Sequence, residues 1–235
     1  MKTYDHSGPA FATLRVHPWT VAQGNPGCRY RDFKETPALV RSSLEDFLPW
    51  AAWPCVDTFY RLVEWLNGPD SILESNDCAF EGPQTNPTPR VAKDLEATGR
   101  LMILWRQLPR NLSRAGTEAL KGAIHRHLAG LDTGLVHAAV GITVCPVRYV
   151  TLPLPEARQA GTQLMLSFWA WGDTDEEVMG NLDRTFQGLR EALGAAAREV
   201  GDSFRRVGPP AGPGRRLISL PSMLDPPGRT PSRSG

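Results

Sequence analysis

The sequence predicts an α+β fold, in which a four-stranded antiparallel sheet with two helices on one face forms a ferredoxin-like split βαβ unit over about residues 99–220. Two observations predict this class. Segments with the two-residue hydrophobic period of a strand alternate with segments that have the period of a helix, in the order strand, helix, strand, strand, helix. A Pro- and Gly-rich linker then precedes residues 216–220, which we assign as the last strand.

The first strand and the first helix of this unit are predicted at residues 100–108 and 113–131. Residues 100–108 form a short apolar run that ends before Pro109, as a buried strand does. Ser113 is a residue type that favours the N-cap of a helix. Large apolar side chains then recur on one helical face at Leu120, Ile124, Leu128 and Leu131.

Two more strands and a long helix follow. Residues 136–145 and 162–171 both alternate large apolar side chains with other residues, which is the pattern of a strand with one face on the core. Thr174 and Glu177 have the spacing of a capping box, so a helix is predicted to begin here. An apolar stripe continues along it as far as Val200.

Residues 1–98 are less regular and are predicted to be a helical and irregular segment that packs on the sheet rather than an independent domain. Residues 56–66 have helical spacing and are followed by Gly68 and Pro69, which end a helix. Residues 72–80 are a candidate strand. At the other end of the chain, residues 221–235 have the composition of a disordered tail.

Tryptophans suggest where the N-terminal segment packs. Trp169 and Trp171 share one face of the third predicted strand, and the opposite face of this strand is also apolar. A strand that is apolar on both faces is covered on both faces or binds a partner with one of them. We therefore expect the N-terminal segment to lie over the Trp169 side, with its own tryptophans as cover: Trp50, Trp53 and Trp65.

Composition and motifs exclude several classes of protein. Of 235 residues, 41% are hydrophobic and 22% charged, and the net charge of +1 does not suit a surface tuned throughout to nucleic acid or anionic lipid. The longest nearly apolar stretch, residues 47–56, is too short to span a membrane, and no secretory signal precedes it. The four cysteines have no CxxC spacing and are interpreted as free thiols. We expect a cytoplasmic protein.

No catalytic or cofactor motif is present, neither HExxH, a Walker motif, GxGxxG nor GxSxG, so we expect no cofactor and no metal. The main hypothesis is a non-catalytic recognition protein that binds a protein partner or another copy of itself. Aromatic and arginine side chains are enriched where proteins bind one another. The candidate binding residues are Trp105, Arg106, Arg110, Arg114, Trp169 and Trp171.

Two other hypotheses remain open. One is a cysteine-dependent hydrolase or transferase with Cys78 as nucleophile, His137 as base, and Asp77 or Glu81 as the orienting carboxylate, although a neighbouring carboxylate disfavours a thiolate. The other is binding of nucleic acid through the basic segment 100–126, where a positive face could follow phosphates. We favour pairing of these basic residues within the molecule or with a protein.

Overall fold

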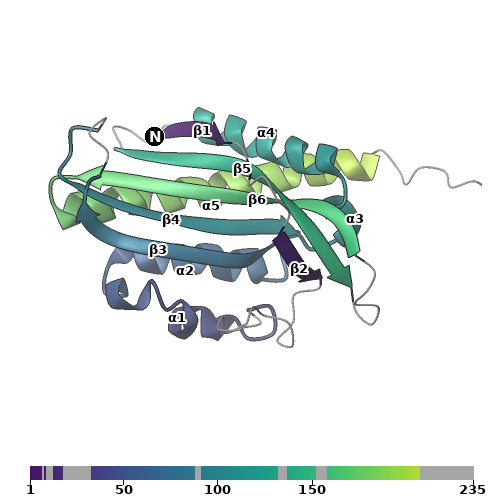
Figure 1. The fold of residues 1–235 in the computed structure, drawn as a ribbon, viewed down its shortest axis with the longest axis horizontal. Coiled ribbons are helices and arrows are strands. Elements are labelled where there is room, and N and C mark those ends of the chain that lie inside the picture. The colour runs from purple at the N-terminus through teal and green to yellow at the C-terminus, as the bar shows by residue number, and fades with distance from the viewer. Residues whose placement is uncertain are drawn as a thin grey trace, which may run out of the picture.

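The computed structural model describes residues 1–6, 8, 13–17, 33–87, 91–131, 137–151 and 158–206. These residues form a mixed α+β fold with a six-stranded, mostly antiparallel sheet in the order β1-β5-β6-β4-β3, and β2 also pairs with β5 (Figure 1). The strands are β1 (Lys2–His6), β2 (Thr13–His17), β3 (Leu73–Thr85), β4 (Leu95–Trp105), β5 (Ala138–Thr151) and β6 (Arg158–Gly172). The helices are α1 (Val40–Ser43), α2 (Pro54–Asn67), α3 (Leu108–Asn111), α4 (Arg114–Gly130) and α5 (Asp175–Arg206), with short 3-10 turns η2 (Pro37–Leu39) and η3 (Leu48–Trp50).

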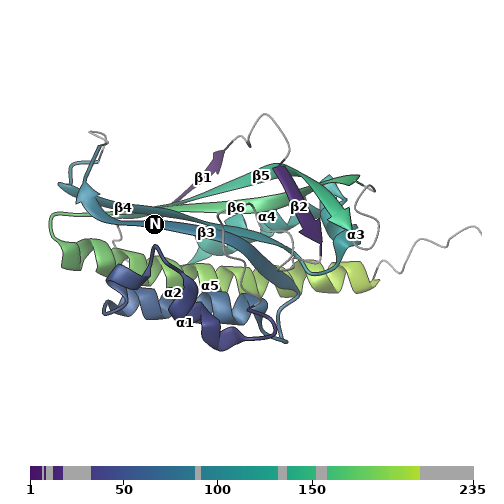
Figure 2. The same cartoon turned by 60° about the horizontal axis from the view of Figure 1, so that its bottom comes forward.

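The three long helices α2, α4 and α5 lie on the same side of the sheet (Figure 2). The longest of them, α5, lies between α4 and α2 and contacts both. One hydrophobic core between this helical layer and the sheet collects buried side chains from all three helices and from β3, β4, β5 and β6. Among the described residues, no helix is long and apolar enough to cross a lipid bilayer.

The predicted α+β class is confirmed, but the ferredoxin-like topology is not. The elements β4, α4, β5, β6 and α5 follow the predicted order along the chain, and β6 lies between β5 and β4 as a split βαβ unit requires. In a split βαβ unit the last strand would pair with the edge of β4 that faces away from β6. Here β3, which precedes β4 in the chain, pairs with that edge as an antiparallel hairpin. The strand expected at residues 216–220 and the tail at 221–235 lie outside the described residues.

Local capping signals were read correctly from the sequence. The Ser113 hydroxyl accepts a hydrogen bond from the Gly116 amide at 3.2 Å and caps α4. At the start of α5, the Thr174 hydroxyl accepts from the Glu177 amide at 3.2 Å, and the Glu177 carboxylate accepts from the Asp173 amide at 2.9 Å. Both caps depend on contacts three or four residues apart, so the neighbouring sequence suffices to specify them.

The position predicted for the N-terminal helix was wrong. The helix α2 packs beside α5, on the side of the sheet opposite the expected one. Trp50, Trp53 and Trp65 pack against the same helix-side core rather than over Trp169 and Trp171. The physical reason is that the apolar face of α2 packs against apolar side chains of α5: Phe59 lies 5.0 Å from Phe186, and the Cys55 thiol lies 3.5 Å from the Met179 sulfur. The layer therefore has three long helices instead of two.

An aromatic cluster joins the two halves of the chain. Phe47 and Phe59, from the first half, stack with their ring centroids 4.2 Å apart, and Phe59 lies 5.0 Å from Phe186 on α5. Phe186 in turn meets Phe168 of β6 edge-on, also at 5.0 Å. The Phe168 ring rests on Gly99 of β4, where an added Cβ would lie only 2.4 Å from it. Residues from both halves thus share one core.

The edge strand β3 is shaped so that it resists pairing with another strand. Its register with β4 is irregular at two places, Ser75/Asp77 and Glu81/Gln84, and Pro83 lies within the second. Two backbone amides are occupied by side chains from outside the sheet: Asp46 accepts from the Phe80 amide, and Asn67 accepts from the Ser75 amide, both at 3.3 Å. Irregular pairing and occupied amides are devices that block edge-to-edge association.

Candidate partner-binding surface

The structure does not bring Cys78 and His137 together. Cys78 lies on β3 opposite Leu101, level with Ile142 of β5, and β4 and β6 lie between. His137 precedes β5 and is five residues away from Ile142. At ordinary strand spacings the two side chains are about 20 Å apart, too far for a nucleophile and its base.

The surroundings of Cys78 do not favour a thiolate. Burial raises the pKa of its thiol to about 12, and the negative charges of Asp77 and Asp46 add to this effect. Asp77 faces Arg100, with 3.5 Å between its carboxylate and the guanidinium, rather than a histidine. Among the described residues, no three His, Cys, Asp or Glu side chains converge to hold a metal ion.

His137 belongs to a charged group at the start of α5. Its Nδ1 lies 3.5 Å from the Glu177 carboxylate, which also pairs with Lys93 at 2.8 Å. Lys93 pairs in addition with Asp173 at 2.7 Å. Lys93 and the Asp173 amide together lower the pKa of Glu177 to about 2. This group attaches the β3–β4 connection to the first turn of α5, which is a structural role.

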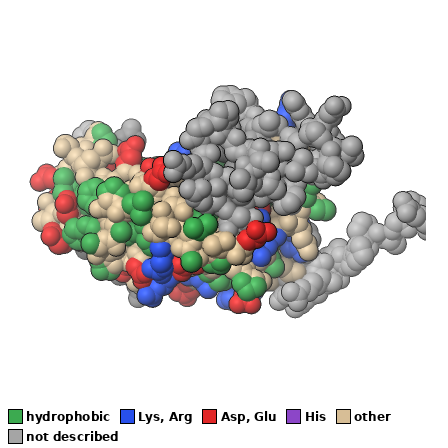
Figure 3. Space-filling model, turned by 90° about the horizontal axis from the view of Figure 1, so that it is seen from below, with side chains coloured by type: hydrophobic (Ala, Val, Ile, Leu, Met, Phe, Trp, Pro, Cys, Tyr) green, Lys and Arg blue, Asp and Glu red, His purple; other side chains and the backbone are tan. Residues whose placement is uncertain are grey.

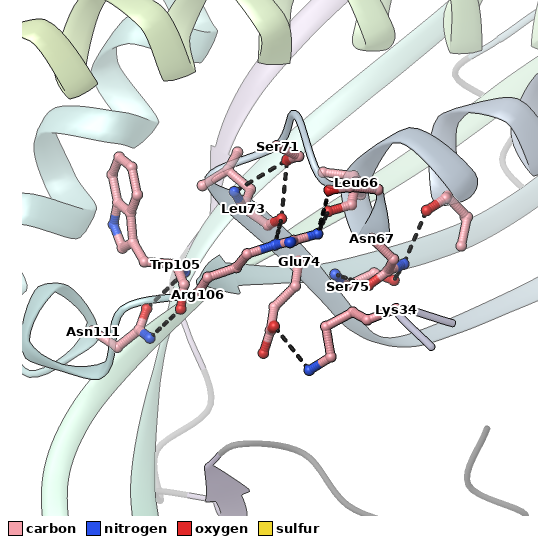
Figure 4. Close-up of polar contacts among 12 residues, drawn as sticks. Lys34, Leu66, Asn67, Ser71, Leu73, Glu74, Ser75, Trp105, Arg106 and Asn111 are labelled. Atoms are coloured by element: carbon pink, nitrogen blue, oxygen red, sulfur yellow. Dashed lines mark hydrogen bonds and ion pairs between the residues drawn. The ribbon is translucent and has the colours of Figure 1, made fainter. Parts of the chain in front are cut away.

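Trp105 and Arg106 at the end of β4 also serve the fold (Figure 4). Trp105 is fully buried, and the Asn111 side chain accepts from its backbone amide at 2.9 Å and donates to its carbonyl at 2.7 Å. The Arg106 guanidinium donates to the carbonyls of Leu66 and Gly68, at 3.2 and 2.6 Å. Arg106 therefore caps the C-terminus of α2, where helix carbonyls lack partners within the helix.

Arg110 lies over the Trp105 ring, with its guanidinium carbon 4.9 Å from the ring centroid. Arg106 and Arg110 both line a pocket of about 200 Å³. Its other lining residues are Pro69, Ser71, Ile72 and Gln107. Ligand pockets usually measure about 300 to 1,000 Å³. Because Arg106 is engaged by backbone carbonyls and Arg110 by an aromatic ring, the pocket does not define a site for a particular ligand.

Three of the five basic residues predicted as a phosphate-binding face, those on α4, have acidic partners within the molecule. Arg114 lies 3.5 Å from Glu118, and Lys121 binds Asp5 of β1 at 2.8 Å. Arg126 pairs with Glu199 of α5, which also contacts His127 at 2.9 Å. These contacts attach α4 to β1 on one side and to α5 on the other, so its positive charge is balanced locally.

Trp169 and Trp171 are half-buried and lie on the face of the sheet that carries none of the three long helices. The Trp171 indole donates to the Glu96 carboxylate at 2.6 Å, and Glu96 is only 5% exposed. A buried carboxylate with an indole partner is a satisfied polar pair. Of the two tryptophans, Trp171 is therefore committed to a contact within the protein.

The sequence analysis missed an apolar surface at residues 48–54, which we call the apolar turn. Leu48 is 41% exposed, and the turn also exposes Pro49, Ala51, Ala52 and Pro54, while Trp50 and Trp53 are half-buried. The Trp50 ring lies against Gly82 of β3, where an added Cβ would clash with it at 2.1 Å. The available signal was a run of seven consecutive residues without a charged side chain, but in the sequence it was considered only as too short for a membrane span and, through Trp50 and Trp53, as cover for the sheet.

Comparison with known proteins gives no relative from which a function can be transferred: no protein-family model, no curated protein and no solved structure matches this chain. The fold and the surface define a class of protein only. It is a mixed α+β protein with a three-helix layer on one face of its sheet and an exposed apolar turn beside the helices.

Proposed function

We propose that this protein is a cytoplasmic, non-catalytic recognition protein that binds a protein partner through the apolar turn. The single observation that carries the proposal is the exposure of this turn. Among the described residues only two large apolar side chains are more than about two fifths exposed, Tyr4 and Leu48, and Leu48 begins the turn. Contiguous exposed apolar surface that includes tryptophan is typical of protein-binding sites.

The way the turn is held supports this role. Trp50 is anchored on Gly82, and Trp53 is followed by Pro54 at the first position of α2. Two prolines and a helix N-terminus limit the conformations of the backbone, so little ordering entropy is lost on binding. Among the described cysteines, Cys55, Cys78 and Cys145 are free thiols, which supports a reducing compartment.

The other two hypotheses have less support. A cysteine enzyme needs a thiolate and a nearby base, whereas the pKa of Cys78 is raised and His137 is distant. A nucleic-acid binder needs free positive charge, whereas Arg114, Lys121 and Arg126 already pair with carboxylates.

Site-specific photo-crosslinking tests the proposal. A photoreactive phenylalanine analogue is placed at Ala51 in the turn or, as a matched control, at Ala129, which is exposed on α4. We expect a discrete adduct in the producing cells at Ala51 but not at Ala129, lost when Leu48→Asp is added. The adduct is identified by mass spectrometry, and binding is then reconstituted with the purified partner. Absence of an adduct, or the same adducts at both positions, would contradict the proposal.

A further inference from the structure

Acidic side chains surround the apolar turn. Glu45 and Asp46 lie three and two residues before Leu48, the first residue of the turn. Two more acids stand at the first turn of α5, which reaches the same place because the Met179 sulfur lies 3.5 Å from the Cys55 thiol at the start of α2. We call these four residues the acidic rim: Glu45, Asp46, Asp175 and Glu176.

The acidic rim is exposed and has no ion pair with any basic residue that the structure describes. The hydrogen bond that Asp46 accepts comes from a neutral group, the Phe80 amide. The nearest basic residues are engaged elsewhere. Arg41 pairs with Asp57 and Glu64, and Arg61 pairs with Asp57.

Figure 3 shows this side of the molecule from below. Hydrophobic side chains gather on its left half, toward the N-terminal ends of α2 and α5, and acidic side chains appear at the left margin of that area. An apolar centre with a charged margin is the usual anatomy of a protein-binding surface. Basic side chains also adjoin this area in the view, but the nearest described ones, Arg41 and Arg61, pair with Asp57, so the unpaired charge at the margin is acidic.

We propose that the partner of the apolar turn is a basic peptide segment, in which lysine or arginine residues flank apolar anchors. This inference rests on the proposed function and names the chemistry of the partner. An acidic or neutral segment would bury the rim carboxylates without a compensating charge, which is costly, whereas lysine and arginine would pair with them. The same carboxylates repel nucleic acids and anionic lipid surfaces.

A peptide library displayed on phage, with random segments of about 15 residues, tests the inference, because short segments of this length suffice to fill a peptide-recognition surface. The library is selected on the full-length protein and counter-selected on the double variant Leu48→Ser/Ala51→Ser, which keeps the charge and removes apolar surface. We expect turn-dependent peptides that are strongly basic and carry at least one large apolar residue.

Titration of the selected synthetic peptides then isolates the electrostatic part. Neutralising the rim with Glu45→Gln/Glu176→Gln is expected to weaken binding about tenfold, and raising the salt from about 50 to about 300 mM to weaken it comparably. The matched control is Asp70→Asn/Glu191→Gln, which removes exposed carboxylates elsewhere and is expected to leave the affinity unchanged. Thermal unfolding confirms that each variant is folded.

The two proposals fail in different ways. Turn-dependent peptides that are neutral or acidic, or that bind the rim variant as tightly as the unchanged protein, would overturn the basic partner and leave the recognition function standing. If no peptide depends on the turn, both proposals fall. A dimer of the protein alone that is lost in Leu48→Ser/Ala51→Ser would also overturn the basic partner, because a second copy would then be the occupant.

Discussion

The surface of α4 and the surface around the apolar turn are both strongly charged, but they use their charges differently. On α4 the cations pair within the molecule, with Asp5 of β1 and Glu199 of α5 as partners from other elements. Around the apolar turn the carboxylates face solvent, with no cation opposite them among the described residues. A run of like charge in a sequence therefore does not identify a binding surface, because the fold decides which charges are already paired.

A similar contrast exists between buried and exposed reactive groups. The largest effect that we expect is on the labelling rate of two thiols, Cys55 and Cys78. Because burial raises the pKa of Cys55 and Cys78 to about 12, their thiolate populations near neutral pH are on the order of 10³-fold below that of a free cysteine. In a Cys28→Ser background we expect labelling by a thiol reagent at pH 7.5 to be slower than in the unfolded protein by about this factor. Mass spectrometry of the labelled protein measures it.

Rapid labelling of Cys78 in the native state would contradict this prediction. It would mean that an apparently enclosed group is available for chemistry, and it would return the cysteine-enzyme hypothesis to consideration. Labelling confined to Cys55 would point instead to local opening of α2, since its thiol is buried between α2 and α5.

The second prediction compares the loss of stability when Arg106 is replaced with the loss when Leu48 is replaced. Arg106→Ala leaves the C-terminal carbonyls of α2 without their charged donor, so we expect the free energy of unfolding to fall by about 2 to 4 kcal/mol. Leu48→Ser removes an exposed side chain and is expected to cost only about 0.5 kcal/mol. Urea unfolding of both variants measures the difference.

Arg114→Ala is the matched control for the loss of an arginine, because its ion pair with Glu118 is exposed and pairs of this kind contribute about 0 to 1 kcal/mol. If Arg106→Ala were no more destabilising than Arg114→Ala, the capping role of Arg106 would be wrong, and the guanidinium would be free to serve a ligand in the adjacent pocket.

The third prediction has the smallest expected effect. It concerns the contribution of Glu177, at the start of α5, to the stability of the fold. The pKa of Glu177 is lowered to about 2 in the folded protein, chiefly by Lys93, while its value in the unfolded chain is near 4.5. A carboxyl group with a lowered folded-state pKa contributes stability above its unfolded pKa, and the contribution is lost as the pH falls from about 4.5 to about 2. We therefore expect Glu177→Gln to be destabilised relative to the unchanged protein at pH 7, and the two to converge near pH 2.

Thermal midpoints measured across this pH range test the prediction. The control is Asp175→Asn, which removes a carboxylate from the same helical turn that has no ion pair among the described residues. A constant difference between Glu177→Gln and the unchanged protein at all pH values would show that Glu177 acts as a capping hydrogen-bond acceptor, independent of its charge.

The sequence was sufficient for elements whose signals are local. The caps at Ser113 and Thr174 act over three residues, and the apolar stripes of α4 and α5 define their own faces. It was not sufficient for the place of α2. An apolar helix face does not by itself specify which side of a sheet it covers, and the contacts that place α2 are with α5, far along the chain.

The candidate site residues show the same difference between local signals and contacts made by the whole fold. Trp105 and Arg106 were selected for their side-chain types, but their roles depend on carbonyls and an asparagine supplied by other parts of the fold. The apolar turn was visible as an apolar run, yet its exposure depends on where Gly82 and the start of α5 meet it. Patterns in the sequence indicate which residues are buried in an element, but not which apolar residues the completed fold leaves outside.

The pairing of β1 with β5 has a consequence for how the protein is made. Lys2 and its neighbours in β1 are synthesised well before their partner strand, which begins at Ala138. The helix that closes the core, α5, is synthesised later still. Contacts between such distant residues form slowly and only after most of the chain exists. Nascent chains of this protein therefore carry β1 without its partner strand until β5 has been synthesised, and chains that stop before α5 lack the helix that closes the core.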